Sequence, residues 1–159
     1  MNTIFGHVAT LISNREEVAT KALHCILTRS PAACAVMQEI ARVGNSAIPQ
    51  IAGYHVWPSS RSGEGKPDIR GVSGNKQDLL LIECKLWAGL TEHQPVTYLN
   101  RLPQDGVLLF IVPEQRRLSL AMKLEQKLVN SQIATGNWVE AGTIKVLFGE
   151  PSTGGNPYP

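Results

Sequence analysis

The chain has 159 residues, of which 43% are hydrophobic and 18% are charged, and its formal net charge is +2. These values are those of one ordinary globular domain, and they exclude a disordered chain and a polycation. Nucleic-acid binding would therefore need a local basic face.

The three cysteines, Cys25, Cys34 and Cys84, are odd in number and have no C-x-x-C spacing. They predict neither a disulfide framework nor a structural zinc site, and they favour a reducing, cytoplasmic setting. The N-terminus lacks the basic start and apolar run of a signal peptide. No apolar stretch approaches the roughly 20 residues of a membrane span. The sequence therefore predicts a soluble protein.

Two helices are predicted in the first 44 residues. Residues 13–16 fit the S-x-x-E capping box of a helix start. An apolar stripe follows at three- and four-residue steps and consists of Ala19, Leu23, Ile26 and Leu27. Residues 30–31 supply an N-cap serine and a first-turn proline for a second helix, which is expected to end at Gly44.

Strand signals replace helix signals from about residue 50. Residues 52–57, 66–72 and 78–86 predict three strands. The third contains an apolar core at 79–82 that covers both faces, so we expect it to lie in the centre of the sheet. The turn at 74–77 is short, which predicts that the second and third strands form an antiparallel hairpin.

Four more elements are predicted, namely a helix, a strand, a helix and a strand at residues 91–102, 106–113, 115–131 and 143–148. The order α-α-β-β-β-α-β-α-β predicts an α/β fold with a mixed five-stranded sheet flanked by helices. Residues 149–159 are rich in glycine and proline, which indicates a flexible tail or a linker to a missing region. Residues 1–148 are thus the predicted domain.

Charged side chains stand at the ends of the predicted hairpin strands. Asp68 opens one strand and Glu83 nearly closes the next, so a hairpin can bring both carboxylates to one sheet end. Lys85 shares the face of Glu83, whereas the Cys84 side chain points the other way. Crowded carboxylates and a strand-end Cys84 carbonyl are hard oxygen donors suited to Mg²⁺ or Mn²⁺. We expect such a metal to bind a phosphate and activate water, with Lys85 orienting that water.

The pattern Pro67-Asp68…Glu83-Cys84-Lys85, together with the element order from about residue 14 to 148, resembles the PD-(D/E)XK nuclease superfamily. The resemblance implies a restriction-endonuclease-like fold and a metal-dependent phosphodiesterase. It further implies that Asp68 and Glu83 are metal ligands and that Lys85 is the catalytic lysine.

An acidic residue on the first helix is also implied by this resemblance, and Glu16 and Glu17 are the candidates. Glu16 is in phase with the buried stripe and Glu17 with a polar face, so Glu16 is preferred as a catalytic metal ligand. The alternative is that Glu16 only completes the capping box with Ser13. His24 is a weaker ligand candidate, because its polar helix face favours a solvated surface residue.

Residues 94–98, QPVTY, resemble the Q-x-x-x-Y motif of RecB-type members of the superfamily. Gln94 and Tyr98 would share one helix face and contact a phosphate or a base beside the metal. The alternative is a solvent-facing Gln94 and a Tyr98 that packs the helix. Arg70 and Lys66 are candidates for phosphate contacts, with ordinary surface charges as their alternative.

The leading prediction is a divalent-metal-dependent nuclease that hydrolyses DNA phosphodiester bonds in the cytoplasm. Because no sequence-reading module is visible and a tail follows the domain, we expect an effector domain of a larger antiviral-defence or DNA-processing protein. One alternative is a structure-specific endonuclease that resembles Holliday-junction resolvases and acts as a homodimer. Another is a catalytically idle nucleic-acid-binding domain, and RNA stays open as a substrate.

Overall fold

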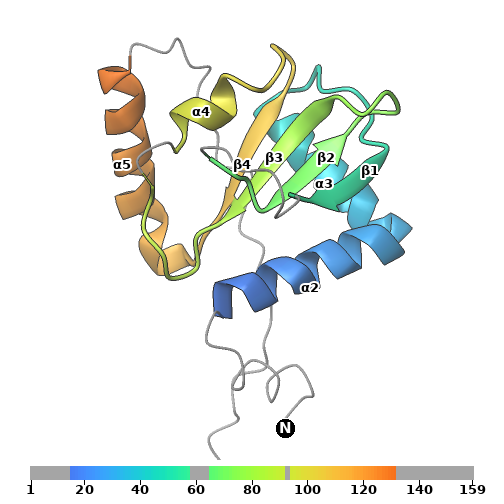
Figure 1. Ribbon diagram of the computed structural model, residues 1–159, viewed down its shortest axis with the longest axis horizontal. Helices are drawn as coiled ribbons and strands as arrows, with labels where there is room; N and C mark the ends of the chain where they lie inside the picture. The colour runs from blue at the N-terminus through green and yellow to red at the C-terminus, as the bar shows by residue number, and fades with distance from the viewer. Residues whose placement is uncertain (1–14, 58–64, 92–93, 132–159) are drawn as a thin grey trace, which may run out of the picture.

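Four strands form a mixed sheet in the computed structural model, which describes residues 15–57, 65–91 and 94–131. The strands are β1 (Gly53–Val56), β2 (Ile69–Val72), β3 (Asp78–Cys84) and β4 (Val107–Ile111), and they lie side by side in that order. β2 pairs antiparallel with both β1 and β3, whereas β3 and β4 are parallel. The predicted antiparallel hairpin and the central place of the third strand are confirmed (Figure 1).

Helices flank this sheet. They are α2 (Arg15–Arg29), α3 (Pro31–Gly44), the single turn α4 (Val96–Leu99), the 3₁₀ turn η1 (Glu114–Arg116) and α5 (Arg117–Asn130). α2 contacts β1 and β3, α3 contacts β4, and α4 and α5 lie on the other side of the sheet from α3 (Figure 1). The chain is therefore an α/β domain with a helical layer on each side of the sheet.

The hydrophobic core fills the space between the sheet and the layer of α2 and α3. Ile69, Leu80 and Ile82 are fully buried there against Leu27 and Met37. Successive strand residues point to opposite faces, so Leu81 and Glu83 belong to the face that α4 covers. This alternation places the Glu83 side chain on one face and the Cys84 side chain on the other, as predicted.

The start of α3 follows the predicted signal. The Ser30 hydroxyl oxygen accepts a hydrogen bond from the Ala33 N–H at 3.2 Å, Pro31 occupies the first turn, and the helix ends at Gly44. A cap of this kind satisfies one of the free N–H groups at a helix start.

The helix predicted over residues 91–102 is wrong in extent, because α4 spans only Val96–Leu99. Pro95 disfavours the α conformation in the residue before it, so Gln94 lies outside the helix. The two hairpin strands are also shorter than predicted, since β2 begins at Ile69 and β3 ends at Cys84. The predicted strand over 143–148 and the capping serine at 13 lie outside the described residues.

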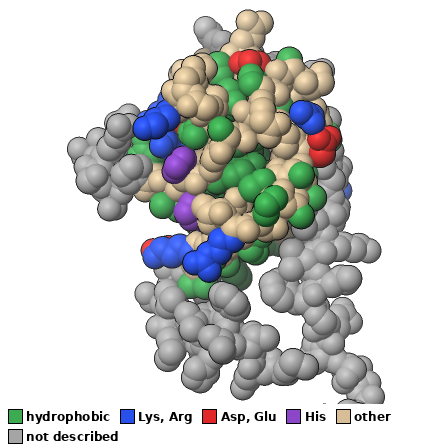
Figure 2. Space-filling model, turned by 90° about the vertical axis from the view of Figure 1, so that its right-hand side faces the viewer, with side chains coloured by type: hydrophobic (Ala, Val, Ile, Leu, Met, Phe, Trp, Pro, Cys, Tyr) green, Lys and Arg blue, Asp and Glu red, His purple; other side chains and the backbone are tan. Residues whose placement is uncertain are grey.

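The side of the molecule at the β1 edge is mixed in character. Hydrophobic side chains gather at the centre of this face, and charged side chains of both signs lie scattered around it (Figure 2). Val36 and Val43 of α3 are among the exposed apolar residues. No helix in the described ranges has the length and apolarity to cross a bilayer.

Candidate active site

The end of the β2–β3 hairpin brings Asp68 beside Glu83. Ile69 pairs with Ile82, so the next position of the register places Asp68 opposite Glu83. The Asp68 carboxylate accepts a hydrogen bond from the Cys84 N–H at 2.7 Å, which closes the ladder with a side chain. A pocket of about 210 Å³ opens here and is lined by Glu16, Glu17, Thr20, Asp68, Glu83, Cys84 and Lys85.

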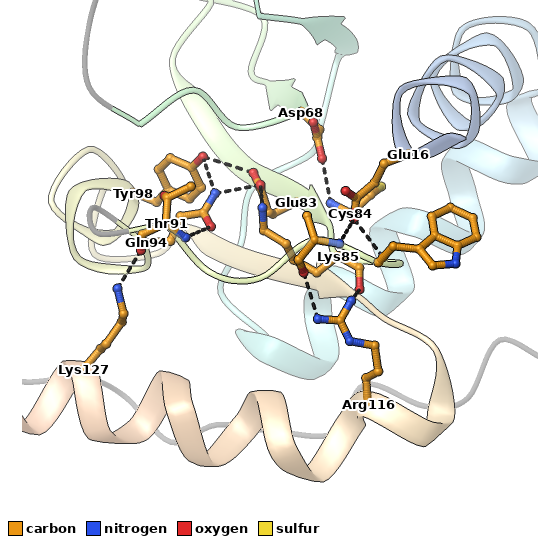
Figure 3. A network of polar contacts seen from close by, with 12 residues as sticks. Glu16, Asp68, Glu83, Cys84, Lys85, Thr91, Gln94, Tyr98, Arg116 and Lys127 are labelled. Carbon is orange, nitrogen blue, oxygen red and sulfur yellow. Dashed lines mark hydrogen bonds and ion pairs between the residues drawn. The ribbon is translucent and has the colours of Figure 1, made fainter. Parts of the chain in front are cut away.

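Glu83 is the centre of a buried polar network (Figure 3). Its side chain is 5% exposed, and its carboxylate accepts from Lys85 Nζ at 2.8 Å, Gln94 Nε2 at 2.7 Å and Tyr98 Oη at 3.0 Å. Lys85 is itself only 8% exposed in its side chain. A buried carboxylate is tolerated when its charge is paired and hydrogen-bonded, and these three donors supply both conditions. Among the described residues, these donors fill three of the roughly four acceptor positions of the carboxylate.

Gln94 and Tyr98 converge on Glu83 although only Tyr98 lies in α4. The Gln94 amide donates to the Tyr98 hydroxyl oxygen at 3.0 Å and accepts from the Thr91 N–H at 3.2 Å. Both side chains are buried, so the alternative of a solvent-facing Gln94 is wrong. Burial and the neighbouring charge of Glu83 raise the pKa of Tyr98, which keeps its hydroxyl protonated as a donor.

The charged form of the Asp68 carboxylate is destabilised in this position. Burial first, and then repulsion by Glu83, raises the pKa of Asp68 above its ordinary value to about 6. The Cys84 N–H and the Lys85 charge act in the opposite direction but do not cancel these effects. Asp68 and Glu83 are two carboxylates at one pocket, and the one ammonium there, that of Lys85, is paired with Glu83, so the site attracts further positive charge.

Cys84 contributes through its backbone. Its side chain is buried, as predicted, and burial raises the pKa of the thiol to about 11 despite a hydrogen bond with Thr20. The thiol is therefore neutral at physiological pH, and a soft thiolate ligand is not formed. The C=O and N–H of one strand residue point toward the same neighbouring strand. Because the Cys84 N–H donates to Asp68, the Cys84 carbonyl also points to the side of β3 on which Asp68 lies.

Glu16 reaches the pocket from the first turn of α2. One of its carboxylate oxygens accepts hydrogen bonds from the backbone N–H groups of Trp87 and Ala88 at 3.2 and 3.3 Å. Glu17 also borders the pocket, but its half-exposed side chain forms an ion pair with Lys21. Of the two candidates, Glu16 is thus the one engaged with the segment that follows Lys85 (Figure 3).

His24 is not the solvated surface residue that its helix face suggested. Its ring nitrogen Nε2 lies 3.2 Å from the Tyr54 carbonyl oxygen, and the ring is half-buried between α2 and β1. Packing of α2 against β1 explains this difference, because it covers a helix face that periodicity treats as free.

The contacts that Arg116 makes with the segment after β3 were not predicted from the sequence. The Arg116 guanidinium donates to the Lys85 carbonyl at 3.1 Å and to the Ala88 carbonyl at 2.8 Å, and so ties η1 to the segment after β3. Lys127 of α5 similarly donates to the Thr91 carbonyl at 2.6 Å. Both cations bind backbone oxygens that are 28 to 36 residues away in the chain, and no local motif signals such contacts.

The two predicted phosphate-contacting cations do not line the pocket. Arg70 forms an ion pair with Asp78 at 3.0 Å, and its guanidinium carbon lies 5.0 Å from the centroid of the Trp57 ring. Lys66 is exposed just before Pro67. The engagement of Arg70 within the hairpin favours a structural role, whereas the position of Lys66 leaves it accessible.

Mg²⁺ or Mn²⁺ prefers hard oxygen donors, and Asp68, Glu83, Glu16 and the Cys84 carbonyl are of that chemistry. Within the described ranges, no three His, Cys, Asp or Glu side chains lie together as a ready metal-binding group. In this arrangement Glu83 is held by three donors and Glu16 by two backbone N–H groups. The oxygen donors therefore fit a divalent cation in their chemistry. To bind it, Glu83 and Glu16 would have to replace some of their present hydrogen bonds with bonds to the metal.

Comparisons with family models, with curated proteins and with solved structures gave no match for this chain.

Proposed function

We propose that this chain is a divalent-metal-dependent nuclease that hydrolyses DNA phosphodiester bonds. One observation carries the proposal, namely that Asp68, Glu83 and Lys85 face one pocket at the end of the hairpin. A buried carboxylate and ammonium beside a second, partly buried carboxylate are costly for the fold, and such costs are concentrated at functional sites.

The proposed roles follow from the contacts. Asp68, Glu83, Glu16 and the Cys84 carbonyl would hold Mg²⁺ or Mn²⁺, which when bound supplies charge neutralisation of the phosphate and a more acidic water. Lys85, held 2.8 Å from Glu83, donates to a phosphate oxygen or orients the attacking water. Gln94 and Tyr98 fix the Glu83 carboxylate rather than contacting substrate themselves.

The deciding experiment measures cleavage of linear, circular, single-stranded and branched DNA and of RNA, with Mg²⁺, Mn²⁺ or EDTA. We expect metal-dependent cleavage of DNA by the wild-type protein and its loss in Lys85→Ala. Lys123→Ala, at an exposed position of α5, is the matched control and should cleave normally. If no substrate is cut, or if Lys85→Ala cuts as fast as wild type, the proposal is wrong, and nucleic-acid binding without cleavage would favour an idle domain.

Tyr98→Phe is expected to slow cleavage by about 10- to 100-fold, because it removes a donor to Glu83 and leaves the carboxylate less firmly oriented. The free energy of unfolding should fall by about 1–2 kcal/mol, since a buried hydrogen bond to a charged group is lost. Initial cleavage rates and urea denaturation measure the two effects.

Tyr54→Phe is the matched control for this variant. Tyr54 is also buried, but its hydroxyl has no hydrogen-bond partner among the described residues. The variant should therefore keep its cleavage rate and its stability within about 0.5 kcal/mol. Equal effects of the two tyrosine changes would contradict a role of Tyr98 through its hydroxyl.

A further inference from the structure

Trp87, two residues after Lys85, presents a large aromatic ring to solvent. The residue is 61% exposed. Trp57, the other tryptophan in the described ranges, differs because the guanidinium carbons of Arg70 and Arg101 both lie 5.0 Å from its ring centroid. A single exposed apolar side chain needs no explanation by itself, but tryptophan is enriched at binding interfaces, so the surroundings of Trp87 decide its role.

The backbone that carries this indole is braced from two sides. Glu16 of α2 accepts from the N–H groups of Trp87 and Ala88 at 3.2 and 3.3 Å. Arg116 of η1 donates to the carbonyl oxygens of Lys85 and Ala88 at 3.1 and 2.8 Å. Residues 86–88 lie outside the sheet ladder, so these four bonds from distant parts of the chain fix the segment, and the two from Arg116 involve no side chain of the proposed metal site (Figure 3).

The braced segment also lies at the pocket. Glu16, which accepts a hydrogen bond from the Trp87 N–H, lines the pocket. Lys85, two residues before Trp87, lines it as well. Two residues of chain span at most about 7 Å between Cα atoms, so the backbone that carries the indole begins within about two nucleotide steps of the Lys85 backbone at the pocket. An indole on a backbone held at this distance can contact a base near the reacting phosphate.

We propose that Trp87 is a stacking platform for an unpaired nucleobase next to the scissile phosphate, so that the site prefers single strands or frayed ends. This inference rests on the proposed nuclease function. An indole stacks on any base, because every base has a flat aromatic face. Bases inside a duplex are already stacked on their neighbours, which leaves unpaired bases as the partners that Trp87 can take.

The test begins with binding in EDTA, where no cleavage occurs. Oligo(dT) is titrated into the wild-type protein while tryptophan fluorescence and the anisotropy of a labelled strand are recorded. We expect quenching in wild type, its loss in Trp87→Phe with affinity largely kept, and an affinity about 10- to 100-fold weaker in Trp87→Ala. Val36→Ala, at an exposed apolar position of α3, is the control and should bind as wild type does.

Cleavage with Mg²⁺ then gives the rate ratio of single-stranded to duplex DNA. This ratio should fall about tenfold or more in Trp87→Ala and be largely retained in Trp87→Phe. Unchanged affinity and ratio in Trp87→Ala would overturn the stacking platform while wild-type cleavage persists. Absence of any wild-type cleavage would instead refute the nuclease function, so the two failures are distinguishable.

Discussion

Changing Glu83 to Gln is expected to slow cleavage by about a thousandfold or more and to lower the free energy of unfolding by about 3 kcal/mol. The change leaves the Lys85 ammonium, whose side chain is 8% exposed, without its charged partner. Lys85→Met should abolish cleavage as well but cost only about 1–2 kcal/mol, because Gln94 and Tyr98 still donate to Glu83. Urea denaturation in EDTA and cleavage rates in Mg²⁺ measure these quantities.

The double variant Glu83→Gln/Lys85→Met separates stability from activity. It removes both charges together, so its stability should return to within about 1–2 kcal/mol of wild type while cleavage stays absent. Glu39→Gln is the matched control, because Glu39 forms an exposed ion pair with Arg42 and should contribute less than about 0.5 kcal/mol. A double variant as unstable as Glu83→Gln alone would show that the buried pair is not the source of the loss.

The hairpin and its charged end could be predicted because both depend on local pattern. The apolar run at 79–82 and the turn before it specify a central strand with a tight connection, and alternation then places Glu83 and Lys85 on one face. The structure adds what the sequence could not specify, namely that the pairing of Ile69 with Ile82 brings Asp68 to the end of β3, where its carboxylate accepts from the Cys84 N–H.

The rest of the site depends on contacts between distant segments. Gln94 and Tyr98 were expected to meet through helix periodicity, yet they meet because a turn before α4 folds Gln94 back onto Glu83. The clamp of Arg116 on the Lys85 and Ala88 carbonyls has no sequence signature. Such contacts are determined by how η1 packs beside the sheet, and a motif search cannot find them.

Asp68→Asn is expected to change activity and stability in opposite directions. Cleavage should fall by about a thousandfold, because a charged donor of the proposed metal site is lost. The pKa of Asp68 is raised to about 6 by burial and by Glu83, so the folded protein favours the neutral carboxyl. That stabilisation is fully present below the unfolded pKa near 4 and is lost as the pH rises through about 6.

At pH 7.5 the charged Asp68 therefore destabilises the metal-free fold, and asparagine removes the charge while keeping an acceptor for the Cys84 N–H. With allowance for solvent screening of this partly exposed group, the metal-free variant should gain about 1 kcal/mol, or a few degrees in Tm. The gain should vanish toward pH 4. Thermal unfolding in EDTA from pH 4 to pH 8 measures it.

Metal addition supplies the complementary measurement for Asp68→Asn. Millimolar Mg²⁺ should raise the Tm of wild type at pH 7.5, because a ligand that binds only the native state stabilises it, and this rise should be largely absent in the variant. Asp78→Asn is the matched control in the same hairpin. It removes an ion pair with Arg70 and should lower stability at pH 7.5 while leaving the response to Mg²⁺ intact. A destabilised Asp68→Asn in EDTA would show that Asp68 is not strained in the metal-free fold. A response of this variant to Mg²⁺ equal to that of wild type would show that Asp68 is not needed to hold a cation.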